Sequence, residues 1–233
     1  MSYFYFNNMI DKKNVNTIFE LGSRDLDDAI KLIKHYDNAT CYSFECNPDC
    51  LIECKKRVSN FDEDQRKRIH LIEKAVYAEN KNIKFLPFDL SKYNNMGSSS
   101  LLEIDFTKRN KDDPDLNRGT VQYEIEVTGI RLDSFMDNRK INNIDLLCID
   151  LQGYELQALH SLGSKIKNVS YIITECSINS TYKNGTEFKE LNEYLEKQGF
   201  TYKCSNKFNQ NFPNLNLTGF SEFDALFINN SLK

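Results

Sequence analysis

Segments typical of buried β-strands alternate with segments typical of amphipathic helices along most of this chain. Strand-like runs occupy residues 17–21, 40–45, 144–149 and 169–174, and helix-like runs follow them at 26–33, from 47 onward, at 153–163 and at 188–195. The run at 144–149, Ile-Asp-Leu-Leu-Cys-Ile, is apolar enough to predict a central parallel strand buried on both faces. This alternation predicts an α/β protein with a Rossmann-like, doubly wound, mostly parallel sheet and helices on both faces.

The remaining segments predict how the chain is completed. Further strand-like runs lie at residues 69–77, 82–88 and 121–128, and two closing strands are predicted at 200–204 and 223–228. A short helical turn is predicted near residues 132–136. Polar stretches that contain Pro and Gly, at 107–120 and 205–219, are typical of exposed loop insertions. With 233 residues and 40% hydrophobic content, the chain can bury one sizeable core, so residues 1–233 are predicted to form a single domain.

Charge and cysteine content exclude several classes of protein. The formal net charge of −4 argues against a surface that neutralises a phosphate backbone, so no nucleic-acid partner is predicted. No apolar run approaches the roughly 20 residues needed to span a bilayer, and residues 1–11 lack the order of a signal peptide, so we predict a soluble, cytoplasmic protein without a membrane partner. Seven cysteines without a Cys-x-x-Cys pair fit a reducing compartment.

Acidic residues stand at the carboxyl ends of four predicted strands. Glu20 lies near the end of the first strand, Glu45 ends the second, Asp150 follows the central strand and Glu175 follows the next one. In an open parallel sheet, ligands bind beyond the carboxyl ends of the strands, where the strand order reverses. We therefore predict the functional site at this edge. The alternative is that Glu20 and Glu45 are ordinary solvated carboxylates.

A single glycine follows the first predicted strand. Gly22 and Ser23 precede a helix, where the backbone can approach a ligand closely and a helix N-terminus can hold a carboxylate. A turn that binds a dinucleotide would carry Gly-x-Gly-x-x-Gly for the pyrophosphate, and residues 22–27 read Gly-Ser-Arg-Asp-Leu-Asp, so an NAD-dependent oxidoreductase is disfavoured. Glu45 is placed to accept hydrogen bonds from two ribose hydroxyls. A nucleoside cofactor without a pyrophosphate is favoured, and S-adenosyl-L-methionine fits that description.

Several segments, in the same order along the chain, resemble the FkbM-type family of methyltransferases. Residues 19–23 (Phe-Glu-Leu-Gly-Ser) are similar to its opening motif, residues 44–48 (Phe-Glu-Cys-Asn-Pro) to its Phe-Glu-Pro-x-Pro, and residues 99–101 to its Ser-Ser-Leu. The most specific segments are residues 132–135, similar to Leu-Asp-Ser-Phe, and residues 144–155, similar to Ile-Asp-Leu-Leu-Lys-Ile-Asp-Val-Glu-Gly-x-Glu; residues 172–175 match the next strand. The resemblance covers about residues 17–200. Cys148 replaces the usual Lys, and Gln152 replaces the usual Glu before the glycine.

The resemblance implies a class I methyltransferase fold, in which a seven-stranded, mostly parallel sheet has an antiparallel last strand. It also implies methyl transfer from S-adenosyl-L-methionine to a hydroxyl, most often of a sugar, so the predicted partner is a carbohydrate or another hydroxyl-bearing acceptor. The residues predicted to contact the cofactor are Glu20, Gly22, Ser23, Glu45, Cys46, Asn47, Ala75, Ser99 and Asp150. Because Cys148 and Gln152 depart from the family pattern, an inactive binding or scaffold protein is the alternative.

Two carboxylates are the candidates for catalysis. A carboxylate near the acceptor can take the hydroxyl proton, and Asp150 is the first candidate, with Glu175 second. The three histidines lie in predicted helices or an outlying strand. Asp150 and Glu175 are predicted to act without a metal ion, since no histidine ligand accompanies them. A zinc site at Cys46, Cys50 and Cys54 is disfavoured for the same reason.

The acceptor is predicted to bind under the two loop insertions. Both loops carry polar residues suited to a carbohydrate, although two solvated connections are an equally good interpretation. Tyr154, Tyr182 and Phe208 are aromatic candidates for stacking on a sugar ring. Core or surface packing of these three rings would look the same in the sequence. Glu155 is interpreted either as an exposed helix residue or as a structural partner.

Overall fold

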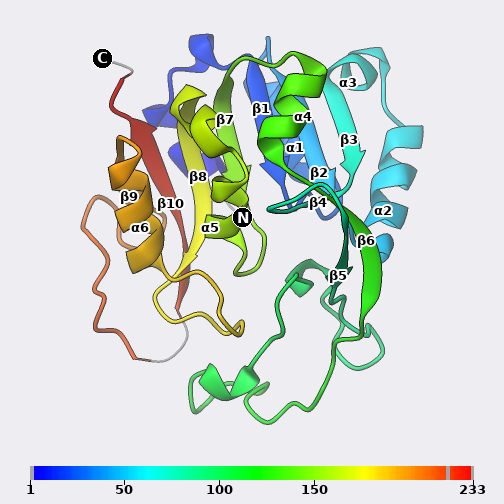
Figure 1. Cartoon of the computed structure of the whole chain (residues 1–233), viewed down its shortest axis with the longest axis vertical. Helices are drawn as coiled ribbons and strands as arrows, with labels where there is room; N and C mark the ends of the chain where they lie inside the picture. The colour runs from blue at the N-terminus through cyan, green and yellow to red at the C-terminus, as the bar shows by residue number, and fades with distance from the viewer. Residues whose placement is uncertain (1–2, 219–220, 232–233) are drawn as a thin grey trace.

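The main sheet of the computed structural model, which describes residues 3–218 and 221–231, has seven strands in the order β3-β2-β1-β7-β8-β10-β9 (Figure 1). The strands are β3 (Ile69–Glu73), β2 (Thr40–Glu45), β1 (Thr17–Leu21), β7 (Ile144–Ile149), β8 (Val169–Ser177), β10 (Glu222–Asn229) and β9 (Phe200–Ser205). All pairs are parallel except those of β10, which is antiparallel to both neighbours. The predicted fold class, including the antiparallel last strand, is confirmed.

The chain reverses its direction of travel across the sheet between β1 and β7. After β1 it proceeds to β2 and β3 on one side, and it later returns to place β7 on the other side of β1. Every residue of β7 is buried, as its apolar sequence predicts. The acid within it, Asp145, lies at the start of the strand, where its Oδ2 accepts hydrogen bonds of 2.8 Å from the backbone N–H groups of Asn16 and Thr17. The switch point therefore has rigid strands on both sides.

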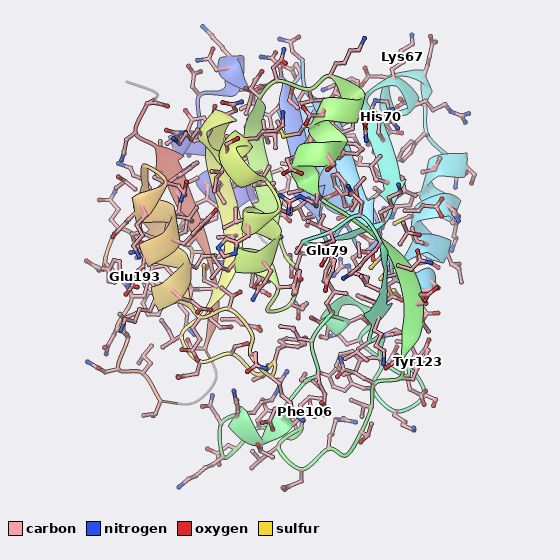
Figure 2. The ribbon with its side chains drawn as sticks, in the orientation of Figure 1. Lys67, His70, Glu79, Phe106, Tyr123 and Glu193 are labelled. Carbon is pink, nitrogen blue, oxygen red and sulfur yellow. The ribbon has the colours of Figure 1, made fainter. Side chains whose placement is uncertain are left out.

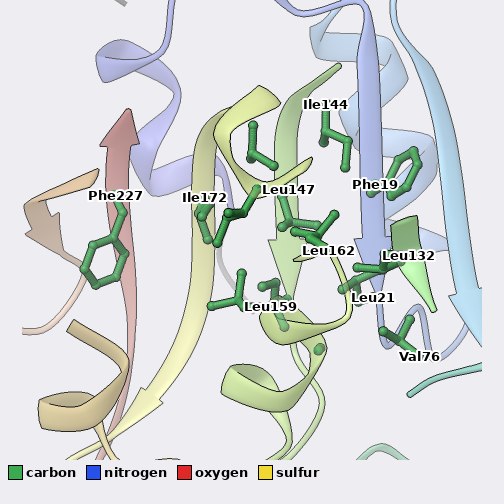
Figure 3. Packing of buried hydrophobic residues seen from close by; sticks show 14 of the residues in the cluster. Phe19, Leu21, Val76, Leu132, Ile144, Leu147, Leu159, Leu162, Ile172 and Phe227 are labelled. Carbon is green, nitrogen blue, oxygen red and sulfur yellow. The ribbon is translucent and has the colours of Figure 1, made fainter. Parts of the chain in front are cut away.

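Helices cover both faces of this sheet, because its strands carry apolar side chains on each side. The first face is covered by α4 (Leu132–Arg139), α5 (Glu155–His160) and α6 (Phe188–Lys197), and the second by α1 (Asp27–His35), α2 (Pro48–Ser59), α3 (Glu63–Arg68) and the 3-10 helix η1 (Tyr3–Met9). On the first face, Phe19, Leu147 and Ile172 of the strands pack with Leu159 and Leu162 (Figure 3). This layering is the doubly wound arrangement predicted from the sequence.

Three short strands form a separate small sheet in the order β4-β6-β5. They are β4 (Ala75–Val76), β5 (Asn82–Phe85) and β6 (Ile125–Ile130), with β4 parallel and β5 antiparallel to β6. The single strand expected at 69–77 is thus divided between two sheets. The strand expected at 121–128 begins later, because Val121 packs into a small apolar cluster instead of pairing within this sheet.

The remaining boundaries differ from the predictions by a few residues. The helix expected at 153–163 is shorter, and the 3-10 helix η5 (Gly163–Asn168) follows it. The short 3-10 helix η3 (Met96–Ser98) precedes the first insertion, η4 (Phe106–Lys108) overlaps its start, and η2 (Lys12–Asn14) precedes β1. β8 continues through Ser177, so Glu175 lies inside the strand and not after it.

The segments 86–124 and 178–186, which we call the cap, lie beyond the carboxyl ends of the central strands (Figure 1). Phe88, Ile104, Phe106, Val121 and Tyr182 form an apolar cluster of their own within it. The predicted insertion at 107–120 is therefore irregular but anchored at both ends by this cluster. The second insertion is also irregular over residues 206–218, and residue 219 lies outside the described residues. Within the described part of the chain, no helix is long and apolar enough to cross a membrane.

Candidate active site

A cavity of about 290 Å³ opens at the carboxyl edge of the main sheet, beside the switch point between β1 and β7. The residues predicted to bind the cofactor line it, with the exception of Glu20, and so do both predicted catalytic residues: Gly22, Ser23, Glu45, Cys46, Asn47, Ala75, Ser99, Asp150 and Glu175. The fold thus gathers side chains from distant parts of the chain around one hollow.

Gly22 is required at the switch point for a reason that the sequence does not reveal. Its φ is +85°, and a Cβ atom built on it would lie 1.8 Å from the carbonyl oxygen of Asp150. The two loops approach this closely because the Asp150 N–H donates a 2.9 Å hydrogen bond to the Leu21 carbonyl. Any side chain at position 22 would push apart the loops that form the cavity.

Glu45 is held by backbone N–H groups on both of its carboxylate oxygens. Oε1 accepts from Cys46 at 2.7 Å and Asn47 at 2.8 Å, and Oε2 accepts from Arg24 at 2.8 Å. Burial raises the pKa of this carboxyl even though the three N–H groups lower it. Since a carboxylate has about four acceptor positions, three are occupied and one remains for a ligand. The hydrogen bonds predicted from two ribose hydroxyls stay a prediction, and the three N–H groups leave one of the four positions for them.

Asn47 ties helix α2 to the wall of the cavity. Its Oδ1 accepts from the Asp49 N–H at 3.2 Å and caps the helix, while its Nδ2 donates to the Met96 carbonyl and to Ser99 Oγ at 3.2 and 3.1 Å. Ser99 Oγ also accepts from the Phe88 N–H at 3.2 Å. Both lone pairs of this hydroxyl are therefore used, and its hydrogen is left to donate to a ligand in the cavity.

Glu20 lies beneath the cavity on the α1 face of the sheet. Its backbone neighbours in the sheet are Ser43 and Cys148, and its side chain is 1% exposed. Burial raises the pKa of Glu20 to about 8, although the Ser43 hydroxyl lowers it. Its Oε2 and the hydroxyl of Ser23, which does line the cavity, are both buried without a hydrogen-bond partner among the described residues. The predicted contact between Glu20 and a cofactor is not direct in this arrangement.

The other end of the cavity is acidic. Gln152 Nε2 donates to Asp150 Oδ1 at 2.7 Å and to Glu175 Oε2 at 2.8 Å, so one amide bridges both predicted catalytic carboxylates. Burial, followed by the charge of Asp150, raises the pKa of Glu175 well above its usual value. The same two causes raise the pKa of Glu222 to about 7. Asp150 is thus one of three carboxyl groups that share this end of the cavity.

The methyltransferase FkbM domain family matches residues 20–202. The chain belongs to the FkbM methyltransferase family. The resemblance seen in the sequence is therefore confirmed. The 2-O-methyltransferase NoeI of Sinorhizobium fredii is 23% identical over 180 residues, which make up 76% of this chain and 70% of NoeI.

Solved structures share the fold of this FkbM-family chain. The structure of methyltransferase FkbM from Methylobacillus flagellatus KT has a TM-score of 0.56 at 10% identity, and covers 97% of this chain and 47% of that one. This chain therefore spans about half of the length of that protein. TrmK from M. capricolum, in complex with S-adenosyl-homocysteine, has a TM-score of 0.51 at 15% identity, and covers 99% of this chain and 69% of TrmK.

The two departures from the FkbM-family pattern lie in different environments. Cys148 is fully buried in the core on the α1 face, where it packs with Ile173 and Leu226. It lies outside the cavity lining, so the missing lysine does not alter the cavity wall. Gln152 does line the cavity, and its φ of +53° places it in a left-handed turn before Gly153. The second departure therefore changes the cavity wall, and the first changes the packing of the core.

Several residues that line the cavity were not predicted from the sequence. Tyr3, from η1, and Arg24, from a loop that is left-handed at that residue with φ of +55°, both line the cavity, and neither falls in a motif. Glu222 also lines it, because β10 is antiparallel to β8 and its amino end therefore meets the carboxyl end of that strand. The predicted antiparallel last strand was a signal that pointed to Glu222.

The three aromatic residues predicted to stack on a sugar ring lie in different parts of the fold. Tyr154 lines the cavity and stacks on Tyr77, with ring centroids 5.9 Å apart. Tyr182 is buried in the cap cluster, and the ring of Phe208 packs edge-on against Phe223. Of the three, Tyr154 alone is placed to contact an acceptor. Glu155 is the structural partner, since its Oε1 accepts from the Leu151 and Gly153 N–H groups at 3.1 and 3.0 Å.

The histidines and the candidate metal ligands lie outside any arrangement in the described residues that suits catalysis by histidine or binding of a metal ion. All three histidines are described, and none of them is part of the cavity wall. Across residues 3–218 and 221–231, no group of three or more His, Cys, Asp or Glu side chains is arranged to hold a metal ion. Burial raises the pKa of Cys54 to about 12 and also raises the pKa of Cys46 and Cys50.

Proposed function

We propose that this chain transfers a methyl group from S-adenosyl-L-methionine to a hydroxyl of a sugar or glycan. The observation that carries the proposal is the cavity at the switch point, which brings Glu45 and Ser99 together with Asp150 and Glu175. A 2-O-methyltransferase is among the relatives, and a solved structure of the same fold holds S-adenosyl-homocysteine, the product left by such a donor.

The polar groups of the cavity fit this cofactor. Glu45 keeps one free acceptor position for a ribose hydroxyl, and Ser99 keeps its hydrogen as a donor. The hydroxyl of Ser23 lines the cavity and also faces the buried carboxyl of Glu20, whose pKa it lowers. At Gly22 the cavity wall carries no side chain, because the Asp150 carbonyl oxygen occupies the place of a Cβ atom.

The acidic end of the cavity fits the acceptor side of the reaction. When bound, S-adenosyl-L-methionine supplies an electrophilic methyl group attached to a positively charged sulfur. Asp150 is the proposed base, which orients the acceptor hydroxyl and takes its proton. Glu175 is the second carboxylate and is held beside it through Gln152. Holding the reacting groups in place accounts for much of the rate enhancement expected of such a site.

The composition supports the remaining parts of the proposal. A net charge of −4 favours a small or carbohydrate acceptor over a nucleic acid. All seven cysteines are described and free, which favours the reducing environment of the cytoplasm. A single methyltransferase domain over residues 1–233 stays a prediction.

Titration calorimetry and a donor assay test the proposal. Purified protein is titrated with S-adenosyl-L-methionine and S-adenosyl-homocysteine, and methyl transfer is measured against a panel of sugars and glycans. Glu45→Ala is expected to weaken donor binding about tenfold or more, since it removes the ribose acceptor and frees three N–H groups. Asp150→Asn is expected to lower turnover about 100-fold and to leave S-adenosyl-homocysteine binding within threefold.

Glu53→Ala, on the outer side of α2, removes an exposed carboxylate outside the cavity and serves as the control. If neither ligand produces heat of binding, the chain is the binding or scaffold protein of the alternative hypothesis. Tight, salt-sensitive retention on heparin would instead indicate a nucleic-acid methyltransferase.

A further inference from the structure

Gln152 connects the two candidate catalytic carboxylates through one amide group. Both hydrogens of its Nε2 are used, one by Asp150 Oδ1 and one by Glu175 Oε2. With the –NH₂ group on this side, each of its two hydrogens has a carboxyl oxygen as acceptor, whether or not Glu175 carries a proton on its other oxygen. The amide therefore fixes the distance and direction between carboxylates from β7 and β8.

The other end of the same side chain is anchored to the cap. The hydroxyl of Tyr182 lies 2.7 Å from the Ser98 carbonyl and 2.9 Å from Gln152 Oε1, and its single hydrogen is shared between these two acceptors. The backbone carbonyl of Gln152 accepts from Ser100 Oγ at 2.8 Å. The residue is thus connected to β7, β8 and both segments of the cap at once.

Neutrality matters at this position because the surroundings are acidic. The titratable or charged groups that face Gln152 from the elements packed around it are Asp150, Glu155, Glu175, Tyr182 and Glu222, with Asp224 and the cations Arg109 and Lys207 beside Glu222. A third carboxylate between Asp150 and Glu175 would have to share a proton with them, as closely spaced carboxyl groups do. An amide donates to both carboxyl groups and adds no further charge.

We propose that Gln152 is a positioning residue, whose amide clamps the Asp150 and Glu175 carboxylates in a fixed arrangement at the acceptor end of the cavity and couples them to the cap through Tyr182. This inference rests on the proposed function for its catalytic consequence. The clamp itself is a property of the ligand-free protein.

The decisive variant is Gln152→Glu, which keeps the shape of the side chain and replaces its donor by a carboxylate. Thermal unfolding of the ligand-free protein is followed from pH 5 to pH 9. The neighbouring carboxylates raise the folded-state pKa of the new carboxyl above its unfolded value, so its stability contribution is present at low pH and is lost as the pH rises. We expect a Tm close to that of the parent at pH 5 and a deficit that grows towards pH 9.

Two further variants separate the clamp from a general loss of folding. Gln152→Asn keeps an amide and tolerates the left-handed backbone, but it is one methylene too short to span both carboxylates. Its Tm deficit is expected to be the same at every pH. Adding Asp150→Asn to Gln152→Glu exchanges the amide and the carboxylate, and is expected to restore most of the alkaline stability. Gln65→Glu, in the capping box of α3, makes the same chemical change where Glu and Gln are interchangeable and is the control.

The catalytic consequence has its own readout once an acceptor has been found. Gln152→Glu is expected to shift the acid limb of the kcat profile upward by about one pH unit and to lower kcat at pH 7 about tenfold. The KM for S-adenosyl-L-methionine is expected to stay within threefold. Tyr182→Phe releases one end of the clamp and is expected to lower kcat about threefold without moving the profile.

The two proposals fail separately. A Tm difference between parent and Gln152→Glu that does not change with pH overturns the clamp, whatever the activity of the protein. A chain that does not bind S-adenosyl-L-methionine overturns the proposed function, and the stability measurements on the ligand-free protein still decide whether the clamp exists. An unchanged kcat profile in an active Gln152→Glu variant overturns the positioning role.

Discussion

Single buried carboxyl groups give this protein a definite dependence of stability on pH. Glu20 and Glu155 are both buried. Burial raises the pKa of Glu20 to about 8 and the pKa of Glu155 to about 7. A carboxyl group in an unfolded chain titrates near 4.3. The folded state therefore binds these protons more tightly than the unfolded state does.

The sign of the effect follows from this difference. Because the folded-state pKa of Glu20 is raised, its contribution to stability is fully present below about pH 4.3 and is lost as the pH rises through 8. We predict that the free energy of unfolding in urea falls between pH 5 and pH 8.5. In Glu20→Gln the fall is smaller by on the order of 2 kcal/mol, since a neutral amide needs no proton.

Glu193→Gln on α6 is the control for this measurement, because Glu193 is exposed (Figure 2). Its pH dependence is expected to match that of the parent. If the parent were equally stable at pH 5 and pH 8.5, Glu20 would not hold its proton as described.

At the scale of an element, the N-cap residue of α2, Asn47, has two structural roles. Asn47 caps the helix through its Oδ1 and holds the wall of the cavity through its Nδ2. We predict that Asn47→Ala lowers the free energy of unfolding by about 1 kcal/mol, the usual cost of a lost cap. It should also weaken S-adenosyl-homocysteine binding about threefold or more by calorimetry, because Ser99 loses one of the two donors that orient its hydroxyl.

A matched variant separates the two tasks of Asn47. Asp62 caps α3 in the same way, through a hydrogen bond from the Gln65 N–H of 2.8 Å, and lies outside the cavity lining. Asp62→Ala should cost a similar amount of stability and leave ligand binding unchanged. Equal binding by the two variants would show that Asn47 acts on the helix alone.

At the scale of the whole molecule, the cap is a second, smaller packing unit beside the main core. Its apolar cluster is separate from the two clusters that cover the faces of the sheet. The side chain of Gln122 connects three parts of the cap. It donates to the carbonyls of Leu86 and Leu102 at 3.2 Å each and accepts from the Ile104 N–H at 2.8 Å. A small cluster of this kind is expected to open locally at a lower free energy than the sheet.

Phe106→Ala tests this division. Phe106 is 4% exposed and contacts the ring of Tyr93 at a centroid distance of 5.6 Å. We predict that its removal speeds hydrogen exchange at least tenfold in residues 86–124 and 178–186 and leaves β1, β7 and β8 protected, as measured by mass spectrometry. Tyr123→Ala removes an exposed ring of the same segment and should change little (Figure 2). Uniformly faster exchange throughout the chain would show that cap and sheet unfold as one unit.

The sequence by itself determined the main sheet. The boundaries of β1, β2 and β7 agree with the predicted runs, because short apolar segments between turns form buried strands in an α/β protein. It also placed the candidate site at the carboxyl edge, and it supplied all but Glu20 of the predicted cofactor residues in the cavity lining. The strand boundaries follow from local periodicity, the place of the site follows from a rule of topology, and the set of cofactor residues follows from the resemblance to the FkbM family.

Only the tertiary structure decided which groups share the cavity and what each one contacts. Strand alternation turned Glu20 towards the opposite face, three backbone N–H groups occupied most of Glu45, and Gln152 came to bridge Asp150 and Glu175. Tyr3 and Glu222 entered the lining from parts of the chain that carry no motif. Hydrogen bonds between distant segments depend on distances that are set when the sheet and the cap pack together, and no local pattern records those distances.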